Sequence, residues 1–451
     1  MKLLRFWTHS PLKHLYQQAG LPEKIRRSLN IMILANMFGT MHAIICGGGT
    51  STMIGFASSL GAGDLVFGIL AGLPQAASLL QIPFAVLVSA KQKRKRYLLT
   101  FGLASRALWL LFGFIPLLAP KDPAYLQIIS LIFLLGISSS LGAVINVCWF
   151  PWLSDLTPLS IRGRWMGFRE MLLSLTNIIF GLLVAFLLDN LPPQSRYLIV
   201  FAVGGTVGVL DMLCFRFVEE VYTAAPRRMK LGRTLKAVYS NKPFMRLLMM
   251  WTVWCFTANL AGPYLTPYAR NVMGLSFTQI MIFGTLSGSI ATMIIMPWWG
   301  KLLDKRGPRQ VMLMAFAGAS FASSSYLLAR PGSVLPVFLH NFVGALFWSG
   351  TNLSASALQL SCSPDDIRSA HIAIFSSVTA LVGTAFGSLT GGTFLEICAA
   401  NQWFSGAFDR YKALVLLAVT LRFSTALLLV PRLQDGYVNH AQERTDNTRS
   451  E

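Results

Sequence analysis

Two stripes of residues suited to ligand binding stand in stretches of the sequence that are otherwise apolar. In the first, Asn146 follows Ser139 and Gly142 at the spacing of one helix face. In the second, Trp348 and Asn352 repeat that spacing. An amide donates and accepts hydrogen bonds, so it suits hydroxyl groups, and an indole can cover an apolar ring face. The stripes predict contacts with a neutral polar molecule, although asparagine between helices also bonds neighbouring helices.

Three charged residues also stand inside apolar stretches, where an ionisable group is costly and is a functional candidate by default. They are Arg106, Asp211 and Arg422. Arg422 has no obvious partner in the sequence. Glu170 opens another apolar stretch, where the helix dipole favours a carboxylate, and it can also pair with Arg164 or Arg169.

The elements that must position these residues are long apolar helices. The chain is 54% hydrophobic and 12% charged, whereas a soluble chain carries roughly 25% charged residues. A helix of about twenty apolar residues spans a hydrocarbon core and satisfies its own backbone groups there. We therefore predict an all-α membrane protein with about twelve spans. They are expected at 28–48, 64–89, 97–119, 125–149, 166–188, 196–216, 246–268, 277–299, 310–329, 333–356, 370–395 and 411–431.

The distribution of charge predicts the orientation of these spans. The net charge is +20, and the basic residues cluster in alternate connections, at 91–96, 162–169 and 227–236. The connections 47–63 and 118–125 contain one basic residue between them, Lys121. This is the asymmetry of the positive-inside rule. It predicts a multi-pass protein of the plasma membrane, the inner membrane in a bacterium, with both termini cytoplasmic, and it argues against a nucleic-acid partner.

The reactive side chains do not form a site of their own. None of the six cysteines forms a close pair with metal or redox spacing. The sequence also contains no HExxH, no GxSxG and no cluster of cysteine and histidine. We therefore expect no metal, no cofactor and no disulfide, and a membrane-embedded enzyme is not expected.

Internal repetition divides the chain in two. Pro158 and Pro364 have the same separation as Asn146 and Asn352. Two parallel halves joined by a basic linker are typical of carriers with a site between the halves near the midplane. The expected organisation is an N-terminal segment 1–27, a first half 28–216, a linker 217–245, a second half 246–431 and a tail 432–451.

The loop GKLLDKRGPRQ, residues 300–310, contains the most specific motif of the chain. Its motif residues are Gly300, Asp304, Lys305, Gly307 and Arg309. The loop is similar to a loop motif of the major facilitator superfamily, and PLSIRGRWMGFRE resembles that family's loop between spans four and five. The span count and the linker extend the resemblance over most of the chain.

The first-half loop, SAKQKRKRYLL, departs from the motif because it has no Asp and no glycine pair. The chain also lacks the span-four arginine typical of proton-coupled members and the span-five Gly-Pro signature of drug/proton antiporters.

The resemblance implies that spans 1, 4, 7 and 10 line a central cavity. The candidate cavity residues are Asn36, His42, Asn146, Trp149, Trp254, Asn259, His340, Asn341, Trp348 and Asn352. The two histidines are candidate proton carriers, or they fill hydrogen-bonded structural roles. These spans contain no Asp or Glu, so a coupling proton or cation and simple facilitation both stay open. The resemblance also makes spans 3 and 6 neighbours, so Arg106 and Asp211 are expected to pair.

Asp304 is interpreted as part of a gate. One hypothesis is a local ion pair with Lys305 or Arg306. The other, suggested by the resemblance, is a latch that joins Asp304 to the start of span 5 and to the Arg162–Arg164 loop and forms when the cytoplasmic side is closed. The full set of candidate gating residues is Gly300, Asp304, Lys305, Gly307, Arg309, Arg162, Arg164 and Glu170.

These observations predict a secondary transporter that moves a small solute across the lipid bilayer by alternating access. An organic anion would need Arg or Lys in the cavity, and the central parts of the cavity spans have neither. A neutral polar solute such as a sugar is therefore favoured. The alternatives are an exporter of amphipathic, drug-like compounds, which would use the same aromatic residues, and a sensor on the same fold that transports nothing.

Overall fold

The computed structural model describes residues 16–433 except 18, 85–87, 89–92, 119, 121–124, 222–230, 364–367, 405 and 407. These residues form helices and turns, and no strand occurs among them. Their contacts define two compact units, Met1–Gly61 with Ala77–Arg227, and Ala62–Ala76 with Arg228–Glu451. The expected tail and most of the expected N-terminal segment lie outside the described residues, as does the middle of the linker. The boundaries expected for the halves stay predictions.

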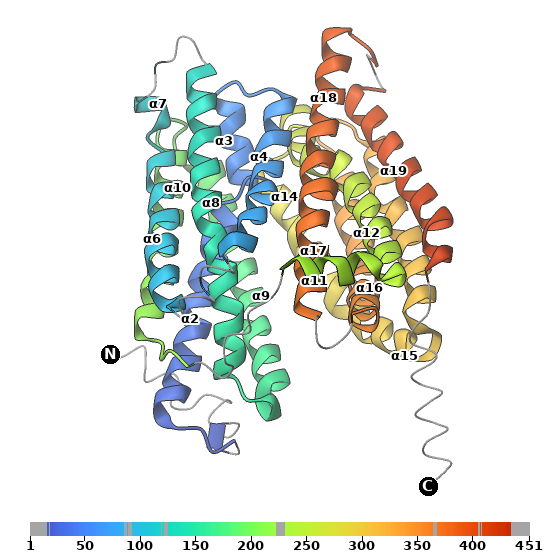
Figure 1. The fold of residues 1–451 in the computed structure, drawn as a ribbon. Coiled ribbons are helices and arrows are strands. Elements are labelled where there is room, and N and C mark those ends of the chain that lie inside the picture. Colours follow the sequence, from blue (N-terminus) through green and yellow to red (C-terminus); the bar gives the residue numbers. More distant parts are fainter. Residues whose placement is uncertain are drawn as a thin grey trace. The chain divides into compact units, whose positions relative to one another are not determined.

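The first unit contains seven helices among its described residues (Figure 1). They are α2 (Glu23–Ile45), α3 (Ser51–Ser59), α6 (Arg94–Phe112), α7 (Ile115–Leu118), α8 (Tyr125–Leu156), α9 (Leu159–Asn190) and α10 (Arg196–Cys214), with 3₁₀ turns at Ser78–Leu80 and Phe215–Phe217. Helix α6 packs against both α8 and α10, and α10 also packs against α2. The apolar core of this unit includes the fully buried side chains of Met32, Trp152, Trp165 and Phe215.

A segment before α2 is also anchored to the first unit. The Tyr16 hydroxyl donates a hydrogen bond to Asn30 Oδ1 at 2.8 Å and accepts one from Trp165 Nε1 at 3.2 Å. Burial raises the pKa of Tyr16 above its ordinary value, so the hydroxyl keeps its proton at neutral pH. At least this part of the expected N-terminal segment therefore packs against the helices.

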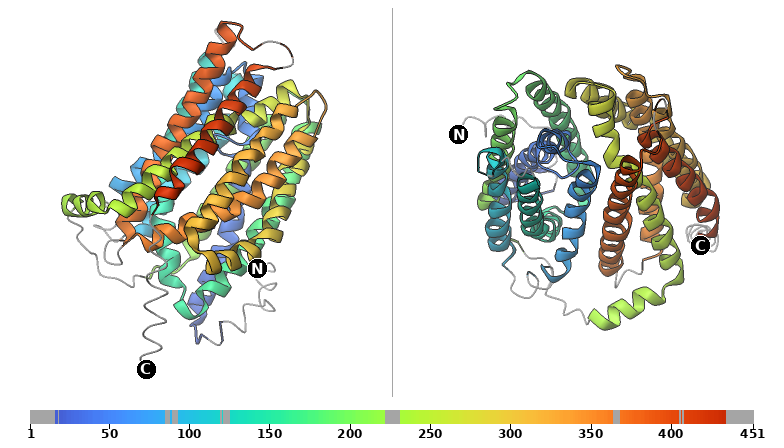
Figure 2. Two further views of the ribbon diagram at one scale, coloured as in Figure 1. Left: turned by 90° about the vertical axis from the view of Figure 1, so that its right-hand side faces the viewer. Right: turned by 90° about the horizontal axis from the view of Figure 1, so that it is seen from above.

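The second unit contains the remaining helices (Figure 1; Figure 2). They are α4 (Asp64–Ala77, of which residues 64–76 belong to this unit), α11 (Leu231–Ser240), α12 (Lys242–Ala261), α13 (Leu265–Pro267), α14 (Phe277–Ile280), α15 (Ser287–Ala322), α16 (Leu335–Ser361), α17 (Arg368–Val378), α18 (Phe386–Ala400) and α19 (Arg410–Leu428). Turns of 3₁₀ helix occur at Gly262–Tyr264, Ser323–Leu328 and Val430–Arg432, and π-helical turns at Tyr268–Val272, Met281–Leu286 and Thr379–Ala385.

Side-chain caps fix where several of these helices begin. The Asn241 side chain accepts a hydrogen bond from the Phe244 amide at the start of α12. Asp409 does the same for the Lys412 amide at the start of α19. Such caps satisfy amides that have no partner within the helix. Asn241 also donates to the Cys362 carbonyl at 2.8 Å, so it ties the start of α12 to the end of α16.

Helix α15 is interrupted within the motif loop. Gly307 has φ 75° and ψ 163°, a conformation that suits glycine. Phe347 lies against both Trp299 and Gly318, on either side of this break. In a continuous helix these two residues would stand about 28 Å apart, because the rise is about 1.5 Å per residue. The segments before and after Gly307 therefore lie side by side, and this confirms the tight turn expected between spans 8 and 9.

The described helices are consistent with the predicted twelve spans. Nine are long and apolar enough to cross a membrane by length and composition. One of these, Phe277–Leu328, contains the Gly307 break and accounts for two spans. Helices α6 and α16 correspond to two further predicted spans, 97–119 and 333–356. The all-α membrane fold expected from composition is thus confirmed.

Glycines allow α18 and the π-helical turn before it to pack closely against α12. Gly383, Gly387 and Gly391 face α12 at intervals of four residues, and an added Cβ at Gly387 would lie 2.5 Å from the Phe256 carbonyl oxygen. Small residues at such spacing let helix backbones approach in a membrane, where dispersion replaces the hydrophobic effect as the attraction. Helices α12 and α18 lie side by side in Figure 1.

Helix α4 packs onto the same part of the second unit. An added Cβ at Gly72 would lie 3.2 Å from the Ala385 Cα, and one at Gly392 would lie 2.9 Å from the Leu65 Cα. An added Cβ at Gly68 would lie 2.7 Å from the Ser388 carbonyl oxygen. The sequence predicts α4 as the second span of the first half. Residues 64–76 of this helix nevertheless pack within the second unit, beside α18.

We expect Gly387→Ala to lower the stability of the protein by about 1–3 kcal/mol, the usual cost of overpacking. The added methyl group would force α18 away from the Phe256 carbonyl. The measurement is the thermal unfolding midpoint in detergent. The control is Gly167→Ala, where an added Cβ meets nothing within 4 Å and helix propensity improves. Equal midpoints for the two variants would contradict the close contact.

Candidate functional site

An aromatic cluster in the second unit joins α12, α15 and α16. The Trp254 ring stacks on Phe316 with the ring centroids 3.7 Å apart, and it lies 5.8 Å from the Trp348 centroid. Trp254 is fully buried, and its Nε1 has no hydrogen-bond partner among the described residues. Trp348 is 37% exposed. Two of the expected cavity residues, Trp254 and Trp348, are thus in contact, and one of them has an open surface.

The exposed face of α16 continues with polar side chains. Asn352 follows Trp348 by one turn and is exposed, and Ser356 is exposed one turn further on. Residues four apart share a helix face. The face therefore offers an indole, an amide and a hydroxyl in succession, within a helix that has no Asp, Glu, Lys or Arg.

The other expected cavity residues of the second unit have partners within their helices or face its interior. Asn341 donates to the Val337 carbonyl at 2.9 Å, and Asn259 donates to the Cys255 carbonyl at 2.8 Å. The His340 ring packs edge-on against Tyr326 at 5.4 Å, and its Nδ1 has no partner in the described part of the chain. An amide side chain also has a carbonyl oxygen that can accept a hydrogen bond.

The first unit places its expected cavity residues in three different settings. Asn146 is exposed on α8. Trp149 is half-buried, with the Arg169 guanidinium 4.9 Å above its ring. Asn36 is half-buried on α2, and its Nδ2 has no hydrogen-bond partner among the described residues. Asn146 and its repeat counterpart Asn352 are both exposed, each on its own helix. Their joint role in one site stays a prediction.

His42 lies in the interior of the first unit. Its Nδ1 is 2.8 Å from the Gly204 carbonyl oxygen, and its ring packs edge-on against Trp109 at 5.8 Å. An added Cβ at Gly208 would meet this ring. Of the two roles expected for His42, this setting favours the hydrogen-bonded structural one, because neighbouring helices enclose the imidazole.

Arg106 and Asp211 pair, as expected. Arg106 Nη2 lies 3.4 Å from Asp211 Oδ2, and the Asp211 side chain is 6% exposed. An added Cβ at Gly39 would lie 3.0 Å from the same carboxylate oxygen. The pair therefore joins α6 to α10 beside α2. Its burial in the wall of the unit indicates a structural role.

Arg422, for which the sequence offers no partner, is held by neutral acceptors. Its guanidinium donates to the Thr257 and Ala258 carbonyls at 3.3 and 2.7 Å, and to Ser323 Oγ at 2.8 Å. Helix α12 ends just beyond, at Ala261, and the Gly262 amide also donates to the Ala258 carbonyl. Arg422 thus joins the end of α12 to α19 and to the turn Ser323–Leu328.

The residues of the motif loop do not form a local ion pair. Asp304 is exposed, and no ion pair joins it to Lys305 or Arg306 in the described residues. Arg309 instead donates to the Pro431 carbonyl, just beyond α19. Lys305 is exposed, and Gly300 has open space around it.

The expected counterparts of Asp304 lie in the first unit. Arg162 donates to the Thr157 carbonyl at 2.9 Å, and Arg164 is exposed. Glu170 pairs with Arg169 at 2.8 Å, which confirms one of its two expected partners. Because Asp304 belongs to the other unit, its latch to this loop stays a prediction.

The sequence did not predict a cluster of carboxylates with their arginine and tyrosine partners at the start of α19, the end far from the motif loop. Asp64, buried at the start of α4, accepts hydrogen bonds from the Tyr411 hydroxyl at 2.6 Å and pairs with Arg410 Nη2 at 3.0 Å. Nearby, the Tyr268 hydroxyl donates to Asp409 Oδ2 at 2.8 Å. The sequence shows only a carboxylate that opens one span and an Arg-Tyr pair that opens another, so their contact depends on the fold.

The chemistry of these settings is that of binding. The described residues contain no group of three or more His, Cys, Asp or Glu that could hold a metal ion. The open surface of the aromatic cluster offers an indole face with an adjacent amide. Such a surface binds ring faces and hydroxyl groups.

The sequence model of the Major Facilitator Superfamily matches residues 31–430. No match to the sequence was found among curated proteins. Several solved structures share its fold at low identity. A mutant of the nucleoside transporter NupG is 11% identical with a TM-score of 0.67, covering 90% of this chain and 100% of that one.

Two further structures are comparable. A bacterial homologue of the human lysosomal transporter Spinster is 16% identical with a TM-score of 0.65, covering 93% of this chain and 97% of that one. A D-xylose–proton symporter is 15% identical with a TM-score of 0.64, covering 92% of this chain and 99% of that one. All three are transporters and none is an enzyme, and the likeness concerns the fold alone.

The Arg106–Asp211 pair gives a test of its structural role. We expect Asp211→Asn to lower the stability by about 3–5 kcal/mol, because the guanidinium stays charged and buried without a carboxylate. Arg106→Gln should cost less, because Asp211 can take up a proton and lose its charge. Thermal unfolding in detergent measures both, and the double variant should recover part of the loss. A larger loss for Arg106→Gln would contradict this account.

Proposed function

The chain belongs to the major facilitator superfamily, and we propose that it carries a small neutral polar solute, such as a sugar, across the membrane by alternating access. The observation that supports this solute class is the open face of α16, where Trp348 precedes Asn352 and borders the buried Trp254. An indole beside an amide suits a ring that bears hydroxyl groups. An anionic solute would need a cation on this face, and α16 has no charged residue.

The solutes named for two similar structures belong to the same chemical class. One structure is a nucleoside transporter and another a D-xylose–proton symporter. A nucleoside and a pentose both present a ring and several hydroxyl groups. At 11% and 15% identity these likenesses show the fold, so the solute proposal rests on the residues of this chain.

Coupling to protons would require a group that titrates and reaches both sides of the membrane. Asp155 is the one carboxylate in the sequences of α8, α12 and α16, and it forms an ion pair with Arg94 at 2.7 Å. His340 is therefore the remaining candidate on these helices, and its Nδ1 has no partner among the described residues. Transport by the unaltered protein at the same rate with and without a proton gradient would identify a facilitator.

We place two gates at opposite ends of α19. The motif loop contacts the end of α19 through Arg309 and Pro431, and the Asp64–Arg410 pair lies at its start. Nineteen residues of helix separate these contacts by about 28 Å, close to the thickness of a hydrocarbon core. Asp64 belongs by sequence to the first half and Arg410 to the second. Alternating access would therefore require the Asp64–Arg410 pair to open when the site faces that side.

The distribution of basic residues supports an orientation for these gates. The positive-inside rule places the motif loop and both termini in the cytoplasm, and the Asp64–Arg410 pair on the opposite side. In a bacterial cell this corresponds to the inner membrane. Export of an amphipathic compound would use the same aromatic cluster, and a transport assay distinguishes the two solute classes.

The solute class is tested by transport into proteoliposomes. We expect counterflow of at least one radiolabelled sugar or nucleoside. We expect Asn352→Ala to raise KM about 5- to 150-fold, because loss of a hydrogen bond to the bound solute costs about 1–3 kcal/mol. Asn190→Ala, at the exposed end of α9, is the matched control and should leave KM unchanged. Counterflow of amphipathic cations, with no sugar or nucleoside transported, would overturn the solute class.

The two gates are tested by accessibility of a cysteine placed at Ser356, one turn beyond Asn352. We expect Asp304→Asn to increase labelling by an impermeant maleimide from the cytoplasmic side. Asp64→Asn should increase labelling from the other side, because it weakens the pair with Arg410. Both variants should transport more slowly with unchanged solute selectivity. Identical labelling from both sides in both variants would refute this assignment of the gates.

A further inference from the structure

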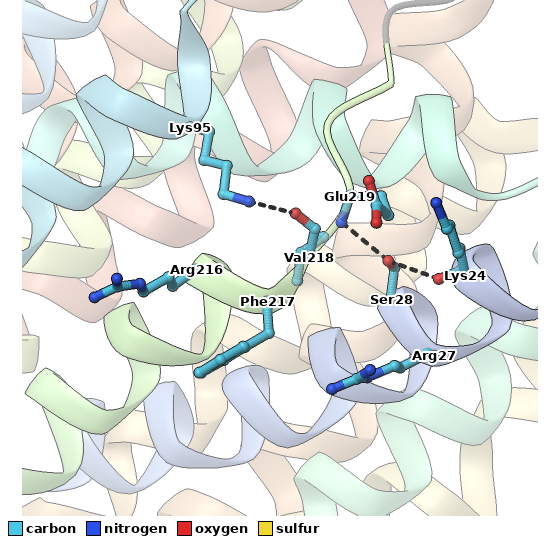
Figure 3. Close-up of a pocket in the computed structure, with 8 residues that line it drawn as sticks. All are labelled: Lys24, Arg27, Ser28, Lys95, Arg216, Phe217, Val218 and Glu219. Atoms are coloured by element: carbon cyan, nitrogen blue, oxygen red, sulfur yellow. Dashed lines mark hydrogen bonds between the residues drawn. The ribbon is translucent and has the colours of Figure 1, made fainter.

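A basic cavity lies in the first unit where α2 and α6 begin and α10 ends (Figure 3). Its volume is about 300 Å³, and it is lined by Lys24, Arg27, Ser28, Lys95, Arg216, Phe217, Val218 and Glu219. We propose that this cavity binds the phosphate of an anionic phospholipid from the adjacent leaflet. The site is separate from the solute path and does not depend on the solute being a sugar.

The charges of the cavity favour an anion. Four lining side chains are cationic, and Glu219 is the single carboxylate among them. Lys24, Arg27 and Arg216 are exposed, and no ion pair neutralises them within the described residues. Like charges gathered at one place repel each other, so a bound phosphate would remove a cost that the free protein bears.

Hydrogen bonds hold the wall of the cavity in place. The Glu219 amide donates to Ser28 Oγ at 3.0 Å, and Ser28 Oγ donates to the Lys24 carbonyl at 2.9 Å. Lys95 Nζ donates to the Val218 carbonyl at 2.8 Å, as Figure 3 shows. Trp152 Nε1 donates to the Glu219 carbonyl. The segment after α10 is thus tied to α2, α6 and α8, and a ligand would meet a formed site, which reduces the entropy lost on binding.

The apolar surface beside the cavity favours a lipid over a free phosphate. Phe217 lines the cavity and is 62% exposed. Leu213 and Leu210 precede it at spacings of four and three residues, and both are about 40% exposed. Residues at these spacings form one helix face, and on a membrane-spanning helix an exposed apolar face meets acyl chains. The face ends at the cavity, so a molecule with acyl chains below a phosphate would contact both.

The test compares two variants of equal charge change. The pocket variant is Arg27→Gln with Arg216→Gln. The control is Lys93→Gln with Arg96→Gln, two exposed basic residues that do not line the cavity. Native mass spectrometry of the full-length protein, titrated in detergent with dimyristoyl phosphatidylglycerol or phosphatidylcholine, gives the affinity of the first bound lipid. Unfolding midpoints of both variants check that they remain folded.

We expect the unaltered protein to bind phosphatidylglycerol at least several-fold more tightly than phosphatidylcholine. The pocket variant should lose roughly 10- to 30-fold in affinity for phosphatidylglycerol, since each basic residue near an anionic headgroup contributes about 1 kcal/mol. The control should lose less than about 3-fold on the same scale. Equal losses in the two variants would show a general charge effect and overturn the site. Competition by millimolar inorganic phosphate as strong as that by the lipid would overturn the lipid as its ligand.

Discussion

Inside a lipid bilayer a polar group must find its partner within the protein, and this requirement organises both units. Arg422 is the clearest case, because it lies buried without a carboxylate and donates to two carbonyls and a hydroxyl. In the first unit the same requirement is met by an ion pair, Arg106 with Asp211. The alternative, an unsatisfied charge or backbone group in hydrocarbon, costs several kcal/mol. Each charge therefore fixes the helices around it, α12 with α19 in one unit and α6 with α10 in the other.

The close approach of helices in the second unit follows from the same setting. Since lipid tails are as apolar as leucine, helices associate through dispersion and hydrogen bonds, and glycines make the contact close. Gly387 and its neighbours four residues away give α18 this contact with α12. The π-helical turns of the described chain also belong to this unit. Such turns are frequent at functional sites, and Thr379–Ala385 includes Gly383, which faces the Thr252 carbonyl of α12.

The open polar and aromatic surface lies next to this well-packed framework. Trp254 is buried and stacked on Phe316, whereas Trp348 and Asn352 present their side chains outward from α16. A rigid aromatic surface with an exposed polar neighbour is suited to hold a ring of the solute in a fixed orientation. The charged residues assigned to the gates lie elsewhere, at the two ends of α19. In the proposed mechanism the neutral surface selects the solute, and the charged ends control access to it.

Apolar run length and charge asymmetry in the sequence were sufficient to predict the all-α membrane fold, the spans and the turn at Gly307, because each depends on residues close together in the chain. The motif at 300–310 was likewise sufficient to suggest the family. The partner of Arg422 could not be predicted, because its acceptors are backbone carbonyls, which every residue has. The Asp64–Arg410 pair escaped for a related reason, since its members are more than three hundred residues apart and only the packing of α4 on α18 brings them together. Local pattern thus determined the helices and their family, and tertiary packing alone decided the contacts of Arg422 and of Asp64, because their partners are backbone carbonyls or lie far away in the sequence.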